Sequence, residues 1–286
     1  MVTIKQDVTS IRCCHEGFEK LATLFSATKE AWLDEIELDF SKCAWFDANM
    51  SSPMSVVLCR LKESNEVAIC NFGEKTELIL RKNRFLTHYG YHPAHDTYGT
   101  TIPFQNFPTH LSIPFFEYLK AHLRGKDMPK MSAGLDRRFK EGILEIFANA
   151  ADHSETAHGI DACGQYFPQR HVLEFCIADA GIGIRRKLQR ELGIKLRSDE
   201  AIEWALSGGN TTRKGPVPGG LGLKLLKDFI TMNGGRLQIV SDRGYWEMHA
   251  GKVSSSRMAA SFPGTAVNIT INTADTKSYK LVSEKG

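Results

Sequence analysis

The feature that most restricts the fold of this chain is an amphipathic segment from about Leu135 to His153 that carries two distinct stripes. Two sets of side chains recur along it at helical spacing: the apolar Ile143, Leu144, Phe147 and Ala151, and the polar Glu145, Asn149, Asp152 and His153. Asn and Asp are poor helix formers, and exposed helix positions usually carry Lys, Glu or Gln. The polar stripe therefore faces either solvent or a polar ligand, and this helix alone does not decide between them.

Composition places the chain among globular proteins with more than one domain. It has 286 residues, of which 42% are hydrophobic and 24% charged, and no run of eighteen apolar residues. The first residues lack the charged start and apolar core of a secretory signal. These properties predict a cytoplasmic protein without a membrane span.

Cysteine, charge and histidine patterns exclude several kinds of site. The seven cysteines are odd in number and form no CxxC pair, which argues against a disulfide framework or a zinc site. A net charge of +3 does not indicate nucleic acid, and we interpret the basic run at 185–190 as a solvated helix face. His88, His92 and His95 lack a regular ligand pattern, so surface histidines are the favoured interpretation.

The first hundred residues alternate strands and helices. Strands are predicted at 35–40 and 67–72, the second of them buried, and helices at 53–62 and 76–90. This alternation indicates a small α/β layer. Turn-forming residues dominate 91–108, and we place a domain boundary there, giving domains at 1–100 and 101–286.

The second half contains three further signals after a predicted helix at 112–125. An apolar strand at 171–178 runs into DAGIGI, where a carboxylate and two glycines would let a flat ligand approach the backbone. The stretch SGGNTTRKGPVPGG ends at an amphipathic helix, and glycines before a helix start expose N–H groups that suit a phosphate. Neither the P-loop nor the Rossmann pattern is present.

Together these pieces resemble the GHKL superfamily, the ATP-binding fold of gyrase B, heat-shock chaperones, MutL and histidine kinases. The resemblance covers roughly Leu111 to Thr273, where EIFANAADH, DAGIGI, PGGLGLKLLKDF and PGTAVNITI follow one another in the superfamily's order. It implies an α+β fold in which the second domain is an α/β sandwich with a mixed sheet and helices on one face.

The resemblance also implies a Mg·ATP site. Asn149 would bind Mg²⁺, Asp179 would recognise the adenine amino group, and Thr265 would support the adenine side. Residues 207–219 would form a lid over the ATP. The other residues expected at the nucleotide are Asp152, Gly181, Gly183, Arg213, Lys214, Gly219, Gly220, Leu221 and Gly222.

Glu145 lies one helical turn before Asn149, where related ATPases and anti-sigma serine kinases have a glutamate. It could act as the general base that phosphoryl transfer needs, which is the favoured interpretation, or it could only hold local structure. Arg213 and Lys214 could neutralise γ-phosphate charge or remain solvated.

The first domain resembles, on fainter grounds, the STAS fold of anti-sigma factor antagonists. The resemblance rests on IELDFSKCAWFDANMSSPMSVVL, in which Ala48 stands where such proteins carry a phosphorylated serine. Ser51 and Ser52 are the available substitutes, and an α/β scaffold without this role remains open.

The resulting functional hypothesis is a regulatory Mg·ATP-binding protein, a slow ATPase whose lid state is read by the first domain or by a partner. A protein serine/threonine kinase of anti-sigma type, acting in trans, and a non-catalytic ATP-sensing module are the alternatives. No long two-helix hairpin with a phospho-accepting histidine precedes the ATP domain, so histidine self-phosphorylation is not expected. About a dozen residues follow the final strand, so mechanical output would use another chain or the first domain. Homodimerisation is left open.

Overall fold

The computed structural model describes residues 2–207 and 221–284. Within these residues the chain has an α+β fold built on two main sheets, one of three strands and one of five. None of the helices that the structure describes combines the length and apolar composition that crossing a membrane requires.

The smaller sheet comes from the first part of the chain and is parallel, in the order β1-β2-β3. Its elements are β1 (Thr3–Asp7), α1 (His15–Thr28), β2 (Glu35–Asp39), the 3₁₀ turn η1 (Ala48–Met50), α2 (Ser51–Lys62), β3 (Glu66–Cys70), α3 (Glu74–Lys82) and η2 (Phe85–Tyr89). Helical crossovers connect the strands, as parallel pairing requires.

The larger sheet has the order β4-β6-β7-β9-β8. The elements of this part are β4 (Thr101–Phe107), α4 (Ser112–Leu123), β5 (Lys130–Met131), α5 (Ala133–His153), β6 (Ile160–Phe167), η3 (Pro168–Arg170), β7 (Val172–Asp179), α6 (Ile184–Leu192), α7 (Ser198–Leu206), α8 (Leu221–Asn233), β8 (Arg236–His249), β9 (Lys252–Asn272), β10 (Ser278–Tyr279) and η4 (Val282–Glu284). All four pairings in this sheet are antiparallel rather than mixed as expected. For two of the pairings the reason is local, because short turns join β6 to β7 and β8 to β9, and such turns connect antiparallel neighbours.

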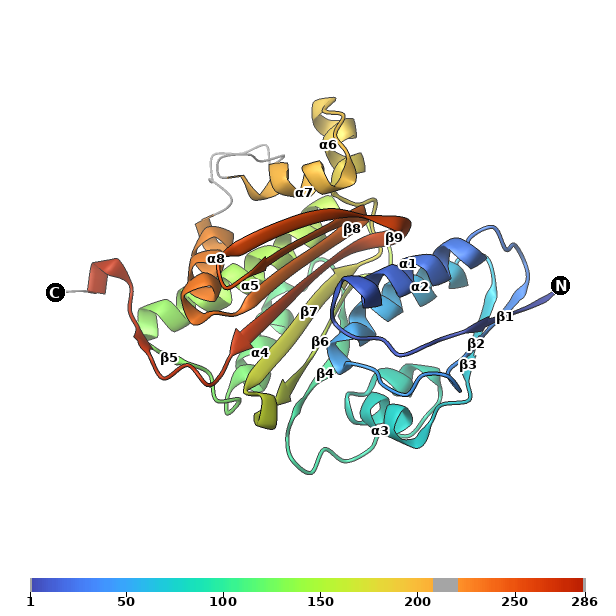
Figure 1. Cartoon of the computed structure of the whole chain (residues 1–286), viewed down its shortest axis with the longest axis horizontal. Coiled ribbons are helices and arrows are strands. Elements are labelled where there is room, and N and C mark those ends of the chain that lie inside the picture. Colours follow the sequence, from blue (N-terminus) through green and yellow to red (C-terminus); the bar gives the residue numbers. More distant parts are fainter. Residues whose placement is uncertain (1, 208–220, 285–286) are drawn as a thin grey trace.

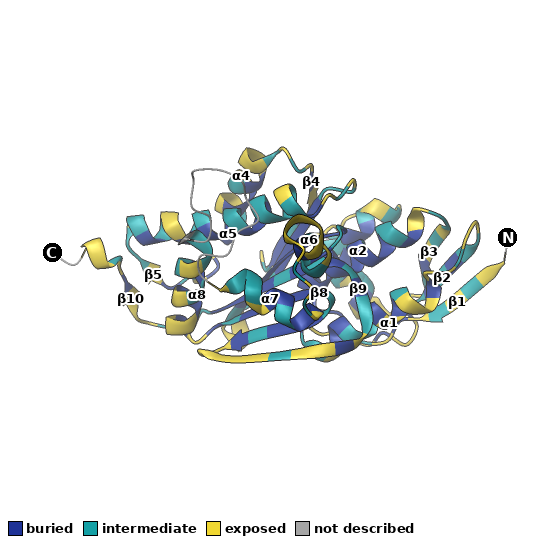
Figure 2. Cartoon of the chain, turned by 90° about the horizontal axis from the view of Figure 1, so that it is seen from above, coloured by how far each residue is buried: buried dark blue, intermediate teal, exposed yellow. Residues whose placement is uncertain are grey.

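Helices cover both faces of the larger sheet (Figure 1). On one face α4, α5 and α8 pack over the strands, and on the other α1 and α2 lie across them. Figure 2 shows the dark blue buried residues concentrated between these layers.

Strand alternation divides the larger sheet between two hydrophobic cores. Along β7, Phe175 and Ile177 belong to the core under α5, whereas Cys176 and Ala178 belong to the core that includes α1 and α2. The second core is continuous from the three-stranded sheet to this face of the five-stranded sheet. We placed the boundary in the turn-rich residues 91–108, of which 91–100 form the loop that joins the two sheets and 101–107 form β4. The division into separate domains stays a prediction.

Most of the predicted elements are present. The expected elements at β2, α2, α4, α5, β7 and α8 are confirmed within a few residues. The Ser132 side chain accepts a hydrogen bond from Leu135 N at 3.2 Å, so α5 begins with a side-chain cap.

Two details of the first part were predicted wrongly. The strand β3 was expected to be buried, but it lies at the edge of its sheet and only Ile69 is buried. The helix expected to run to Gly90 ends at Lys82, because Arg84 adopts a left-handed conformation with φ of 65°.

Candidate functional site

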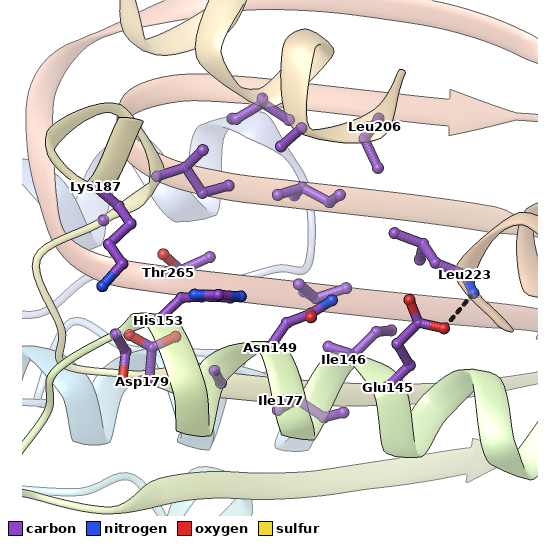
Figure 3. A pocket seen from close by; sticks show the side chains of 18 of the residues that line it. Glu145, Ile146, Asn149, His153, Ile177, Asp179, Lys187, Leu206, Leu223 and Thr265 are labelled. Atoms are coloured by element: carbon purple, nitrogen blue, oxygen red, sulfur yellow. Dashed lines mark hydrogen bonds between the residues drawn. The ribbon is translucent and has the colours of Figure 1, made fainter. Parts of the chain in front are cut away.

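A pocket of about 210 Å³ lies between the second half of α5, the first turn of α8, helices α6 and α7, and the strands β7, β8 and β9 (Figure 3). Its lining residues are Glu145, Ile146, Asn149, Ala150, His153, Ser154, Ile177, Asp179, Gly183, Ile184, Lys187, Leu188, Ile202, Trp204, Ala205, Leu206, Leu223, Ile239, Thr265 and Val267. Most of these side chains are apolar, and the polar ones come chiefly from α5 and the strand ends. Such a lining suits a flat, mostly apolar ligand with a few fixed polar groups.

The polar stripe of α5 supplies one wall of this pocket. Glu145, Asn149 and His153 line it and follow one another at intervals of four residues, so they project from one side of the helix. Asp152 is exposed and is not among the lining residues, although it belongs to the same predicted stripe.

Asp179 and Thr265 form the strand-end side of the pocket. They are directly opposite each other in the β7–β9 ladder, so a carboxylate and a hydroxyl are adjacent although 86 residues separate them in the chain. Asp179 is 4% exposed, and its carboxylate accepts a hydrogen bond from Gly181 N at 2.9 Å. Burial raises the pKa of Asp179 to about 7.

The two glycines of DAGIGI have different roles. A Cβ at Gly181 would lie 2.2 Å from the Ser154 carbonyl oxygen, so this glycine allows the end of α5 to approach the strand. Gly183 lines the pocket and has φ of 78°, a conformation that favours glycine. The Ser241 hydroxyl accepts a hydrogen bond from Ile184 N at 2.9 Å and lies 3.1 Å from the Thr265 hydroxyl, which joins this turn to the strands.

Glu145 connects α5 to the beginning of α8. Its Oε2 atom accepts hydrogen bonds from Gly222 N at 2.9 Å and from Leu223 N at 3.2 Å. The two helices meet closely here, since a Cβ at Gly142 would lie 2.7 Å from the Gly222 carbonyl oxygen. The carboxylate thus satisfies N–H groups that a helix start leaves without intrahelical partners. This geometry supports the structural interpretation of Glu145, and its role as a general base stays a prediction.

Several predicted residues cannot be placed. Arg213, Lys214, Gly219 and Gly220, with nearly all of the expected lid at 207–219, lie outside the described residues. Leu221 begins α8, one residue before Gly222, whose N–H donates to Glu145.

Helices α6 and α7 also line the pocket, which the sequence pattern did not predict. Lys187, in the basic run that we assigned to a solvated face, lines the pocket and forms ion pairs with Glu155 at 3.1 Å and Glu191 at 3.4 Å. Trp204 and Leu206 line the pocket from α7. The signal available for Lys187 was its place one residue before the buried Leu188, which puts it at the border of the inward face.

The serines considered as phosphorylation sites lie elsewhere, against the opposite face of the larger sheet. Ser51 and Ser52 are both fully buried at the start of α2. The Ser51 hydroxyl accepts a hydrogen bond from Asn83 Nδ2 at 2.8 Å, and the Ser52 hydroxyl lies 3.1 Å from the Cys163 thiol. A kinase would have no access to either hydroxyl in this conformation.

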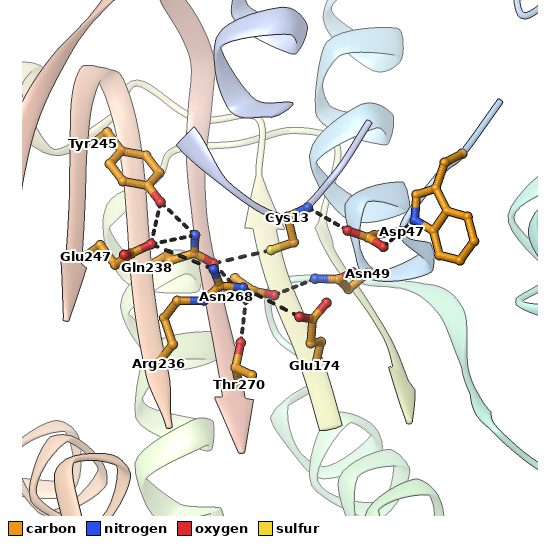
Figure 4. A network of polar contacts seen from close by, with 11 residues as sticks. Cys13, Asp47, Asn49, Glu174, Arg236, Gln238, Tyr245, Glu247, Asn268 and Thr270 are labelled. Carbon is orange, nitrogen blue, oxygen red and sulfur yellow. Dashed lines mark hydrogen bonds and ion pairs between the residues drawn. The ribbon is translucent and has the colours of Figure 1, made fainter. Parts of the chain in front are cut away.

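A buried polar network lies next to these serines (Figure 4). Asn49 Nδ2 donates to Asn268 Oδ1 at 2.7 Å, and Asn268 Nδ2 donates to Gln238 Oε1 at 3.0 Å. The Cys13 thiol also donates to Gln238 Oε1, at 3.3 Å. The network therefore joins the first part of the chain to β8 and β9.

The described residues contain no cluster of three or more His, Cys, Asp or Glu side chains that could hold a metal ion. All seven cysteines are free thiols. No family model and no curated protein matched this chain.

Proposed function

We propose that this protein binds Mg·ATP in the pocket between α5 and the strand ends, and that it acts as a regulatory ATPase. The observation that carries the proposal is the placement of Asp179, a buried carboxylate at the pocket wall. The only hydrogen bond that the described residues give to its carboxylate comes from Gly181 N. A carboxylate is acceptor-only when ionised, so an amino group of a ligand would complete its hydrogen bonding.

The surroundings of Asp179 support adenine as that ligand. Apolar side chains on the β7, β8 and β9 walls, Ile177, Ile239 and Val267, offer flat contacts for a ring. Thr265, across the ladder from Asp179, adds a hydroxyl beside the carboxylate. Gly183 keeps the approach from the loop side free of a side chain. A ring bound here would be oriented by one strong hydrogen bond and apolar contacts.

The α5 stripe supports a phosphate end on the other side of the pocket. Asn149 lines the pocket and could offer its amide oxygen to Mg²⁺, whose remaining ligands would be phosphate oxygens and water. Mg²⁺ in nucleotide sites typically takes only one or two protein ligands. When bound, the ion would offset the negative charge of the phosphates.

A second candidate function, ATP sensing without turnover, is favoured by one observation. The Glu145 carboxylate already accepts two backbone hydrogen bonds from α8. A group held in this way is positioned to stabilise a helix start, and phosphates that take the same N–H groups would displace it. Binding would then change the α5–α8 contact without any chemical step. Phosphoryl transfer to a serine or threonine of a partner protein remains the third expectation.

The test of the binding proposal is calorimetry with a non-hydrolysable ATP analogue and Mg²⁺. Replacing Asp179 by Asn removes the charged acceptor and adds a competing donor, so affinity should fall about tenfold or more. A matched control is Asp161→Asn, which changes a buried carboxylate on the other face of the same sheet. Equal affinity of folded Asp179→Asn and wild type would remove Asp179 from the proposed site.

Incubation with γ-labelled ATP then separates the three functions. Released phosphate indicates an ATPase, label on a partner protein indicates a kinase, and intact bound ATP indicates a sensor. The wild-type chain and Asp179→Asn are measured in parallel, so that activity unrelated to this pocket is recognised.

A further inference from the structure

A second cavity, of about 450 Å³, lies where the first part of the chain meets the edge of the larger sheet. It is bounded by the end of α3, the loop at 93–99, the strand β4 and the last part of α4 with the residues that follow it. Its lining residues are Lys82, Arg84, Pro93, Ala94, His95, Asp96, Gly99, Thr101, Pro103, His122 and Lys126. None of them lines the pocket at Asp179.

Basic side chains dominate this cavity. Five of its lining residues are basic, from three separate parts of the chain: Lys82, Arg84, His95, His122 and Lys126. Asp96 is the one acidic residue among them. A cavity with this composition has a positive potential even when both histidines are neutral.

Among the described residues Asp96 forms no ion pair, although its charge interacts with those of Lys126 and Lys82. Its carboxylate accepts hydrogen bonds from Thr101 N at 2.7 Å and from the Thr101 hydroxyl at 2.8 Å, with the Thr100 hydroxyl at 3.4 Å. These contacts hold the loop against the start of β4. Within residues 2–207 and 221–284, no carboxylate forms an ion pair with Lys82, Arg84 or Lys126.

Burial makes two of the basic groups costly to keep charged. Lys126 is 8% exposed, and its ammonium donates to the carbonyl oxygens of Gly99 and Thr101. Burial lowers the pKa of Lys126, with the charge of Asp96 opposing the fall in part. Burial also lowers the pKa of His122, and the charges of Lys126 and Arg84 lower it further. An anion within the cavity would offset this cost for both groups.

We propose that this cavity is a binding site for a small phosphorylated molecule. A guanidinium and ammonium groups that converge from different elements suit the several oxygens of a phosphoryl group, and the volume is that of a small-molecule site. The bound phosphate would contact Lys82 and Arg84 from the first part of the chain and His122 and Lys126 from the second. It would thereby contact both parts of the chain. None of these four residues lines the nucleotide pocket, so the proposal does not rest on nucleotide binding.

The test measures the binding of inorganic pyrophosphate, the probe, to the full-length chain by calorimetry. The double variant Lys82→Gln/Arg84→Gln removes one half-buried and one exposed cation, which form no ion pair within the described residues. Its pyrophosphate affinity should be at least tenfold weaker than that of wild type. The matched control Lys252→Gln/Arg257→Gln removes the same charge from exposed positions on β9, and its affinity should stay within twofold.

A third variant distinguishes this cavity from the first pocket. Lys187→Gln changes a cation that lines the pocket at Asp179, and it should leave pyrophosphate binding unchanged. Loss of binding in Lys187→Gln with retention in Lys82→Gln/Arg84→Gln would overturn the proposal. Undetectable binding of pyrophosphate to wild type at millimolar concentration would overturn it as well. Asp179→Asn should bind pyrophosphate as wild type does. The nucleotide proposal is therefore tested separately, by the affinity of that variant for the ATP analogue.

Discussion

On its two faces the five-stranded sheet buries polar groups in different ways. The face under α5 and α8 is apolar along most of its length, and its polar side chains lie at the strand ends around the pocket. The face under α1 and α2 carries polar side chains in its middle, including Gln238 and Asn268, which are fully buried. The two sets come from the same strands and differ only in which side of the pleat they occupy.

The two faces differ in whether the protein itself supplies the hydrogen-bond partners of the buried polar groups. Asn268 on the second face contacts Asn49, Gln238 and Thr270, all from the protein itself. Asp179 on the first face receives one hydrogen bond from Gly181 and lies at a pocket wall. A buried polar group whose hydrogen bonds are all made within the protein contributes to a unique packing. A buried polar group that still has a hydrogen bond to make to a ligand lowers stability until the ligand binds. We therefore expect substitutions of polar residues on the face under α1 and α2 to change stability, and substitutions at the pocket on the face under α5 to change function.

The largest effect is expected at Glu145, where a structural and a chemical role would give different results. If it is a general base, Glu145→Gln should lower ATP turnover by roughly 10²–10⁴ while nucleotide still binds. If it only caps α8, turnover should change by less than about tenfold and the free energy of unfolding should fall by about 1 kcal/mol. Steady-state phosphate release and urea unfolding measure the two.

The control for Glu145 is Glu141→Gln, one turn earlier on α5. Glu141 forms surface ion pairs with Arg137 and Arg138 and is not a lining residue of the pocket. Its replacement should leave turnover unchanged. Equal turnover of wild type and Glu145→Gln would assign Glu145 to structure alone.

The next effect concerns the completed network on the other face. Asn268→Leu keeps a similar volume but leaves the Asn49 amide without its partner, and Asn49 Oδ1 already lacks one. The free energy of unfolding should fall by about 1–3 kcal/mol, measured by urea denaturation. Thr265→Val, three residues earlier on β9 and facing the pocket, should change it by less than about 1 kcal/mol. A larger loss of stability in Thr265→Val than in Asn268→Leu would contradict this assignment of the two faces.

The smallest effect is a pH dependence of nucleotide affinity. The pKa of Asp179 is raised to about 7, so in the free protein this carboxyl is protonated below pH 7 and ionised above it. Only the ionised form is acceptor-only, so affinity should fall as pH decreases through 7, by up to about tenfold per unit. Calorimetry at pH 8, 7 and 6 measures this slope. In Asp179→Asn the slope should retain only the part due to titration of the nucleotide phosphates, and identical slopes would contradict the role of Asp179.

The same protonation has a defined effect on stability. Because the folded pKa of Asp179 lies above its ordinary value of 3.8, the folded state binds a proton that the unfolded state has lost between these two values. Stability contributed by this group is therefore full at pH below about 4 and is lost as pH rises through 7. Glu174, on the other face, has a pKa raised by burial to about 7 and acts in the same direction, with Arg236 opposing the rise in part.

The sequence predicted the first face better than the second. The spacing of α5 and the change from an apolar strand to DAGIGI are local patterns, and Asn149, Asp179, Gly183 and Thr265 do line one pocket. On the second face β7 contributes one polar residue, the buried Glu174, and the rest of the strand up to Ala178 is apolar because it is buried on both faces. One polar residue in an apolar strand did not indicate the buried polar network.

The remaining errors have physical causes that local patterns do not contain. Gln238 and Asn268 belong to strands whose polar residues would normally be expected at the surface, and α1 and α2 cover them only through tertiary packing. Lys187 was assigned to solvent because its neighbours are charged, although the inward face of α6 brings it to the pocket. The phosphate end depends on residues outside the described part of the chain, so that part of the site stays a prediction.

The continuous core between the two sheets has a consequence for proteolysis. Cys176 and Phe262 on the larger sheet are buried by side chains from the first part, among them Phe18. Cleavage in the loop at 91–100 would break one chain connection without removing any of these contacts. A nicked protein should therefore migrate as a single particle under native conditions and separate into two fragments only in denaturant.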